Sequence, residues 1–169
     1  MIRLTDSIEI HAPVEKVYAQ LASYLTSKES YLSWHPEHVD LRWIKGEPMQ
    51  EGSIMVGEEY LHGQLHKLKF RVTRIVPNKL ISYRPLFPLS IIATGNTFRF
   101  EPNGEDRCTF IADGHIRFPK WLFLRMHKEH PGKLAASEQH MKGEGENIKR
   151  AVEQATTSQD TSISGSRER

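Results

Sequence analysis

The chain has 169 residues, of which 38% are hydrophobic and 26% are charged, so it can bury a core and is not typical of a disordered protein. Its formal net charge is only +2, with Lys and Arg scattered along the chain, and this pattern does not indicate a nucleic-acid partner. No apolar run is long enough to cross a bilayer, so we expect no membrane insertion.

Two features favour a cytoplasmic location. Arg3, Asp6 and Glu9 place charges where a secretory signal peptide would be apolar. Cys108 is the single cysteine, so no intrachain disulfide can form, which fits a reducing compartment. Cys108 lies in an apolar run, and this predicts a buried, unreactive thiol. The sequence leaves the oligomeric state open, a homodimer included.

The N-terminal part predicts a strand followed by two helices. Apolar residues alternate with polar ones over residues 2–10, as in a strand with one buried face. Pro13 then stands at a first helical turn, ahead of apolar residues at helical spacing. A second short helix or turn is expected over 27–34, and Pro36 interrupts it.

The middle of the chain predicts an antiparallel meander. Turn residues (Gly, Pro and Asn) separate successive runs of β-type sequence, and connections this short join antiparallel neighbours. The strands are expected at 39–45, 52–61, 64–76, 79–84, 91–101 and 106–118.

The C-terminal part predicts helices over 119–130 and 133–155, separated at Pro131 and Gly132. Residues 156–169 are rich in Ser and Thr and show no apolar periodicity, so we expect a disordered tail. The predicted organisation is one domain over 1–155 and a tail over 156–169.

The opening segment Ser7-Ile8-Glu9-Ile10-His11-Ala12-Pro13-Val14-Glu15-Lys16-Val17-Tyr18 and the later Trp34-His35-Pro36 resemble the START-type, helix-grip superfamily. That superfamily includes polyketide cyclases and lipid-transfer domains. The resemblance implies an α+β fold in which a curved antiparallel sheet wraps around a long C-terminal helix and encloses a cavity. It does not by itself fix the function, because this fold hosts carriers, cyclases, hydrolases and receptors.

Polar residues interrupt the apolar face of the last helix. His140 and Glu144 are four residues apart, among apolar residues that share their face, so the two side chains lie on adjacent turns. An ionised Glu on a buried face is costly unless it is paired or binds a metal. The alternative is a surface Glu beside a helical His.

The hairpin at residues 62–63 supplies a second polar pair. A two-residue turn would place Glu59 opposite His66, on the same face as the apolar Leu68 and Phe70. A three-residue loop would turn Glu58 inward instead. The sequence does not choose between Glu58 and Glu59.

A third group of polar residues follows the second short helix, in Trp34-His35-Pro36-Glu37-His38. One of these histidines could be a ligand, or both could cap a turn. Together the three segments supply two His and two Glu, a set that suits Zn²⁺, Fe²⁺ or Mn²⁺ rather than Cu(I), because it contains no thiolate.

This set resembles the zinc-dependent 2,4-diacetylphloroglucinol hydrolase and phloretin hydrolase branch of the superfamily. That branch has a His after a Pro-rich loop, a Glu on a following strand and a His-x-x-x-Glu pair on the last helix. Here the matching residues are His38, Glu59 and the pair His140 and Glu144. The chain is much shorter than those hydrolases.

The resemblance implies a metal-dependent hydrolase that cleaves an acyl–aryl carbon–carbon bond, with metal-activated water attacking the acyl carbonyl. His66 is the expected proton donor to the leaving ring carbon, and Tyr31 is expected to hydrogen-bond a phenolic substrate. The partner is expected to be a small hydrophobic or aromatic molecule, in a cavity lined by Met55, Leu68, Phe70, Asn96, Phe98, Phe100 and Phe110.

Two other functions remain open at this point. The protein could be a non-catalytic carrier or sensor whose His and Glu residues orient a ligand. It could also be a metal-free polyketide cyclase or dehydratase with His66 and Glu59 as acid and base. Only the hydrolase requires a bound metal, so the metal content distinguishes it from the carrier and from the cyclase.

Overall fold

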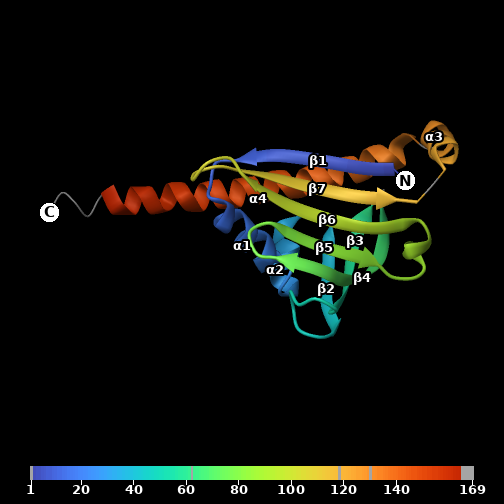
Figure 1. Cartoon of the computed structure of the whole chain (residues 1–169), viewed down its shortest axis with the longest axis horizontal. Helices are drawn as coiled ribbons and strands as arrows, with labels where there is room; N and C mark the ends of the chain where they lie inside the picture. Colours follow the sequence, from blue (N-terminus) through green and yellow to red (C-terminus); the bar gives the residue numbers. More distant parts are fainter. Residues whose placement is uncertain (1, 62, 118, 130, 165–169) are drawn as a thin grey trace.

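A computed structural model describes residues 2–61, 63–117, 119–129 and 131–164. Within these residues, seven strands form one antiparallel sheet in the order β1-β7-β6-β5-β4-β3-β2 (Figure 1). All six meander strands that the sequence predicts are present, with ends shifted by at most a few residues. The strands are β1 (Ile2–Ile10), β2 (His38–Lys45), β3 (Ile54–Leu61), β4 (Gln64–Val76), β5 (Leu80–Pro85), β6 (Ala93–Pro102) and β7 (Cys108–Ile116).

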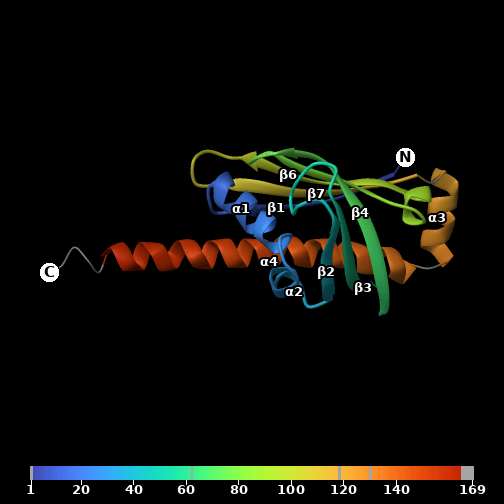
Figure 2. The same cartoon turned by 90° about the horizontal axis from the view of Figure 1, so that it is seen from below.

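The helices cover one face of this sheet. Figure 2 shows the sheet curving over α4, with α1 and α2 beside that helix, which confirms the helix-grip architecture. A short 3-10 helix, η1, was not predicted and lies between β5 and β6. The described helices are α1 (Val14–Tyr24), α2 (Lys28–Trp34), η1 (Leu89–Ile91), α3 (Lys120–Glu129) and α4 (Pro131–Ser164).

The core lies between the sheet, α1 and α4. Leu21 of α1, Phe110 of β7 and Ile148 of α4 are each at most 1% exposed. Cys108 is fully buried, as predicted, and its burial raises the pKa of the thiol to about 11. A thiol of that kind is a structural apolar group rather than a nucleophile.

The C-terminal helix differs from the prediction in length. The break at Pro131 is confirmed, because α3 ends at Glu129 and α4 begins at Pro131, where proline suits a first helical turn. However, α4 continues beyond 155 to Ser164, into the segment predicted to be a disordered tail. Residues 165–169 lie outside the described residues, and the domain boundary at 155 stays a prediction.

The helices of the described ranges include none with the length and apolar character needed to cross a membrane. The cytoplasmic location and the oligomeric state stay predictions.

Candidate metal centre and ligand cavity

The β3–β4 hairpin has the register that a two-residue turn predicts. Glu59 pairs with His66 and Gly57 pairs with Leu68. Glu58 points to the outer face, where its carboxylate lies 2.9 Å from Lys67 Nζ and 3.0 Å from Arg42 Nη2. Glu59 is therefore the inward carboxylate.

The connection between α2 and β2 fixes His38. Ser27 caps the start of α2, the helix ends at Trp34, and His38 then begins β2. The His38 ring stacks on the Tyr31 ring with centroids 3.9 Å apart, and its Nδ1 lies 2.9 Å from the Tyr31 carbonyl oxygen. Because a carbonyl only accepts hydrogen bonds, Nδ1 carries the proton and Nε2 presents its lone pair to the site in the neutral ring.

The last helix is held against α2 by two hydrogen bonds from side chains to backbone carbonyls beside the site. The Trp34 indole N–H donates to the Glu144 carbonyl oxygen at 3.1 Å, and the Asn147 amide donates to the Trp34 carbonyl oxygen at 2.8 Å. These bonds set the rotation of α4 and thereby aim His140 and Glu144 at the sheet.

His140 is oriented by a carboxylate outside the predicted set. Its Nδ1 lies 2.7 Å from Glu37 Oε2. Histidines that bind metals usually donate their second ring N–H to a carboxylate or a carbonyl in this way. His140 Nε2 is buried and has no hydrogen-bond partner among the described residues.

The four predicted ligands come together at one point. His38 Nε2 lies 3.2 Å from Glu144 Oε1 and 3.7 Å from Glu59 Oε2. His140 Nε2 lies 3.6 Å and 3.5 Å from the same two oxygens. A tetrahedral ion with ligand bonds of about 2.1 Å needs ligand atoms about 3.4 Å apart, so the four side chains fit a metal ion.

The charges of the site also favour a cation. Burial opposes a charge on His140, yet Glu144 and Glu59 outweigh it and raise the pKa of His140 to about 11. Burial likewise opposes ionisation of Glu144, but His140 and His38 lower its pKa to about 2. In the metal-free chain, a proton on His140 thus occupies the place of a metal cation.

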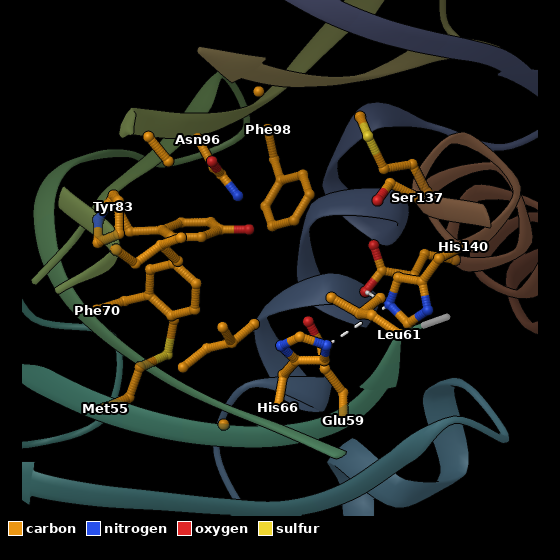
Figure 3. A pocket seen from close by; sticks show the side chains of 18 of the residues that line it. Met55, Glu59, Leu61, His66, Phe70, Tyr83, Asn96, Phe98, Ser137 and His140 are labelled. Atoms are coloured by element: carbon orange, nitrogen blue, oxygen red, sulfur yellow. Dashed lines mark ion pairs between the residues drawn. The ribbon is translucent and has the colours of Figure 1, made fainter. Parts of the chain in front are cut away.

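A cavity of about 430 Å³ opens beside the four ligands (Figure 3). Its size is ordinary for a small-molecule site, and its lining is mainly apolar. Five of the predicted lining residues line it: Met55, Leu68, Phe70, Asn96 and Phe98.

The other two predicted lining residues lie elsewhere. Phe100 and Phe110 are 2% and 1% exposed and belong to the core outside the cavity lining. Phe100 packs edge-on against Tyr18 of α1, with ring centroids 5.3 Å apart. The alternation of side chains along the strands predicted that Phe100 and Phe110 point inward. It did not predict that α1 fills the space beneath this part of the sheet.

The two predicted catalytic residues both line the cavity. The Tyr31 hydroxyl donates to Glu59 Oε2 at 3.1 Å, and burial raises its pKa, with the charges of Glu59 and Glu144 adding to the effect. Tyr31 is therefore a neutral hydrogen-bond donor. His66 is half-buried and lies opposite Glu59 in the hairpin.

A known protein family matches most of this chain. Residues 1–153 match the family described as polyketide cyclase/dehydrase and lipid transport. The chain belongs to this family. A search of curated protein sequences found no match.

Solved structures of the family's fold align along nearly the whole chain. The Zhui aromatase/cyclase of a Streptomyces species is 15% identical, covers 92% of this chain and 95% of its own, and has a TM-score of 0.69. A norcoclaurine synthase mutant from Thalictrum flavum is 16% identical, with 92% and 96% covered and a TM-score of 0.65. A START superfamily protein from Mycobacterium smegmatis is 18% identical, with 90% and 98% covered and a TM-score of 0.60. At these identities the likeness shows the fold alone, and none of these three proteins is described as a hydrolase.

Side chains outside the predicted set of four ligands also contact the site. Glu37 orients His140, as described above. His35 forms a second group of possible ligands with His38 and His140, all three buried. A Cβ on Gly143 would lie 2.7 Å from His35 Nε2, so a glycine at that position makes room for the ring. Contacts such as these join segments about 100 residues apart, and no local pattern predicts them.

Proposed function

We propose that this protein is a metal-dependent hydrolase that cleaves an acyl–aryl carbon–carbon bond of a small aromatic or polyketide-like compound. The observation that carries the proposal is the meeting of four ligand atoms, from His38, Glu59, His140 and Glu144, next to a mainly apolar cavity that all of these residues except His38 line. Two nitrogens and two carboxylate oxygens suit Zn²⁺, with Fe²⁺ or Mn²⁺ as alternatives.

Each residue has a distinct task in this proposal. A divalent ion at the site would polarise the acyl carbonyl and lower the pKa of water. Tyr31 holds Glu59 in place by donating its single hydroxyl hydrogen, and because it stays neutral, its oxygen can accept a hydrogen bond from a substrate hydroxyl. In this proposal His66, opposite Glu59, is the proton donor to the leaving ring carbon. Water thus supplies a hydroxyl to the acyl carbon and a proton to the ring.

Two other functions have some support. The family description includes lipid transport, and the mainly apolar cavity fits a carrier of a hydrophobic molecule. The description also includes cyclases, and His66 and Glu59 could act as acid and base without a metal. Both alternatives predict that removing metal has no effect on function.

The proposal is tested by product analysis on a panel of acylphenols. Protein loaded with zinc, iron or manganese should release the carboxylic acid and the deacylated phenol in equal amounts, and chelation should stop the release. In His66→Gln, the rate should fall about 100-fold with metal content unchanged, because a general acid typically contributes at least that factor. Tight binding of the acylphenols without acid release, for every metal, would instead favour the carrier.

A further inference from the structure

The wall of the cavity opposite His140 carries a second polar pair. Tyr83 of β5 and Asn96 of β6 are direct partners in the sheet register, and both line the cavity. Figure 3 shows both side chains reaching into the cavity from the side opposite His140. The pair therefore faces the four candidate ligands across the cavity.

The position of the Tyr83 hydroxyl is fixed by its aromatic neighbours. The ring packs edge-on against Phe70 with centroids 5.0 Å apart, and at a tilt against Phe98 at 5.5 Å. The Asn96 side chain lies beside it on the neighbouring strand. Because a primary amide has two donor hydrogens and an acceptor oxygen, Asn96 can form a hydrogen bond with a ligand oxygen.

The hydrogen-bonding groups of Tyr83 and Asn96 favour an uncharged oxygen atom on the ligand. Burial raises the pKa of Tyr83, and the charges of Glu144 and Glu59 raise it further, so the hydroxyl keeps its proton. An anionic ligand group would lose its hydration in this mainly apolar cavity, and a neutral group avoids that cost. A phenolic hydroxyl or a ketone can bond to Tyr83 and Asn96 without carrying charge.

We propose that Tyr83 and Asn96 form a specificity site for a hydroxyl group on a flat aromatic ligand whose carbonyl group lies at the metal end of the cavity. The ligand class is thus a hydroxyaryl ketone. Phe70, Tyr83 and Phe98 provide the aromatic walls that an aryl ring prefers. This inference rests on the proposed function only for the orientation of the carbonyl.

The test compares two ligands that differ by one hydroxyl, 4-hydroxyacetophenone and acetophenone. Dissociation constants are measured by calorimetry on the full chain, as the wild type, Tyr83→Phe and Asn96→Ala. Tyr18→Phe is the matched control, because it removes the same oxygen from a tyrosine that does not line the cavity. Metal content and circular dichroism are recorded on every sample.

The wild type and Tyr18→Phe should bind the hydroxylated ligand about tenfold more tightly than acetophenone, as expected for one buried hydrogen bond. Tyr83→Phe should lose that preference and keep its affinity for acetophenone, and Asn96→Ala should weaken the preference. Equal binding of both ligands to the wild type, or no binding of either, would overturn the inference.

The metal measurements separate this inference from the proposed function. A preference that depends on Tyr83 in protein that takes up no metal would support the specificity site and contradict the hydrolase. Full metal content without any preference would contradict the specificity site alone.

Discussion

At the scale of single residues, the site depends on groups that orient the ligands as much as on the ligands. The Tyr31 carbonyl oxygen fixes one tautomer of His38, and Glu37 holds Nδ1 of His140. Both Nε2 atoms consequently face Glu59 and Glu144 before any ion arrives. Orienting contacts of this kind commonly change metal affinity 10- to 100-fold when they are removed.

The raised pKa of His140 predicts that metal binding releases a proton. Because the pKa of His140 is about 11, this residue is protonated at neutral pH in the metal-free chain. It must lose that proton to bind a metal. Glu144, with a pKa of about 2, is already ionised and releases none. At pH 7 we expect about one proton from His140 per ion, and an affinity that rises about tenfold per pH unit from pH 6 to 8. Calorimetry in buffers of different ionisation enthalpy measures the release, and binding without proton release would contradict the account.

The sequence predicts the four converging side chains better than it predicts their surroundings. His140 and Glu144 are found because helical spacing is local, and Glu59 is found because the turn length sets the register of a hairpin. Glu37 and Tyr83 were missed, because their roles depend on contacts with α4 and β6 that no periodicity encodes. Phe100 was misplaced for the same reason.

At the scale of elements, the close approach of α4 to the α2–β2 connection explains a glycine in a helix. Gly143 costs helix stability relative to alanine, by up to about 1 kcal/mol. It faces His35, whose ring centroid is 4.4 Å from that of His140. Alanine at position 143 would favour the helix, but its Cβ would clash with the His35 ring.

We predict that Gly143→Ala weakens metal binding about tenfold or more, because its Cβ would displace the His35 ring, which contacts His140. Gly132→Ala is the matched control in the same helix, since a Cβ there meets nothing within 4 Å among the described residues. That control should retain the wild-type affinity in a metal titration. Wild-type affinity in Gly143→Ala as well would show that the close approach has no role in the site.

At the scale of the whole molecule, the sheet and the first part of α4 contain the core and the site. Among the residues of α4 whose side chains the structure describes, the last one in the core is Val152, at 4% exposure. Figures 1 and 2 both show the end of α4 projecting beyond the sheet. The sequence predicted the fold class and the strands because patterns of period two and turn residues are local. It did not predict the helix past 155, where no apolar face marks a helix.

A chain that ends at Thr156 should therefore fold and keep its site. We expect its melting temperature to stay within about 2 °C of that of the full chain, because the end of α4 projects beyond the sheet. Thermal unfolding followed by circular dichroism measures this. A fall of more than about 8 °C would mean that the C-terminal segment belongs to the domain.

The central claim is that four inward side chains hold one metal ion, and the neighbouring glutamates of β3 test it most directly. Metal content is measured by plasma mass spectrometry on untagged protein prepared without chelator, as the wild type, Glu59→Gln and Glu58→Gln. The account predicts about one zinc, iron or manganese ion per chain in the wild type and in Glu58→Gln, and loss of the ion in Glu59→Gln. No metal in any of the three after reconstitution, or equal metal in both variants, would contradict it.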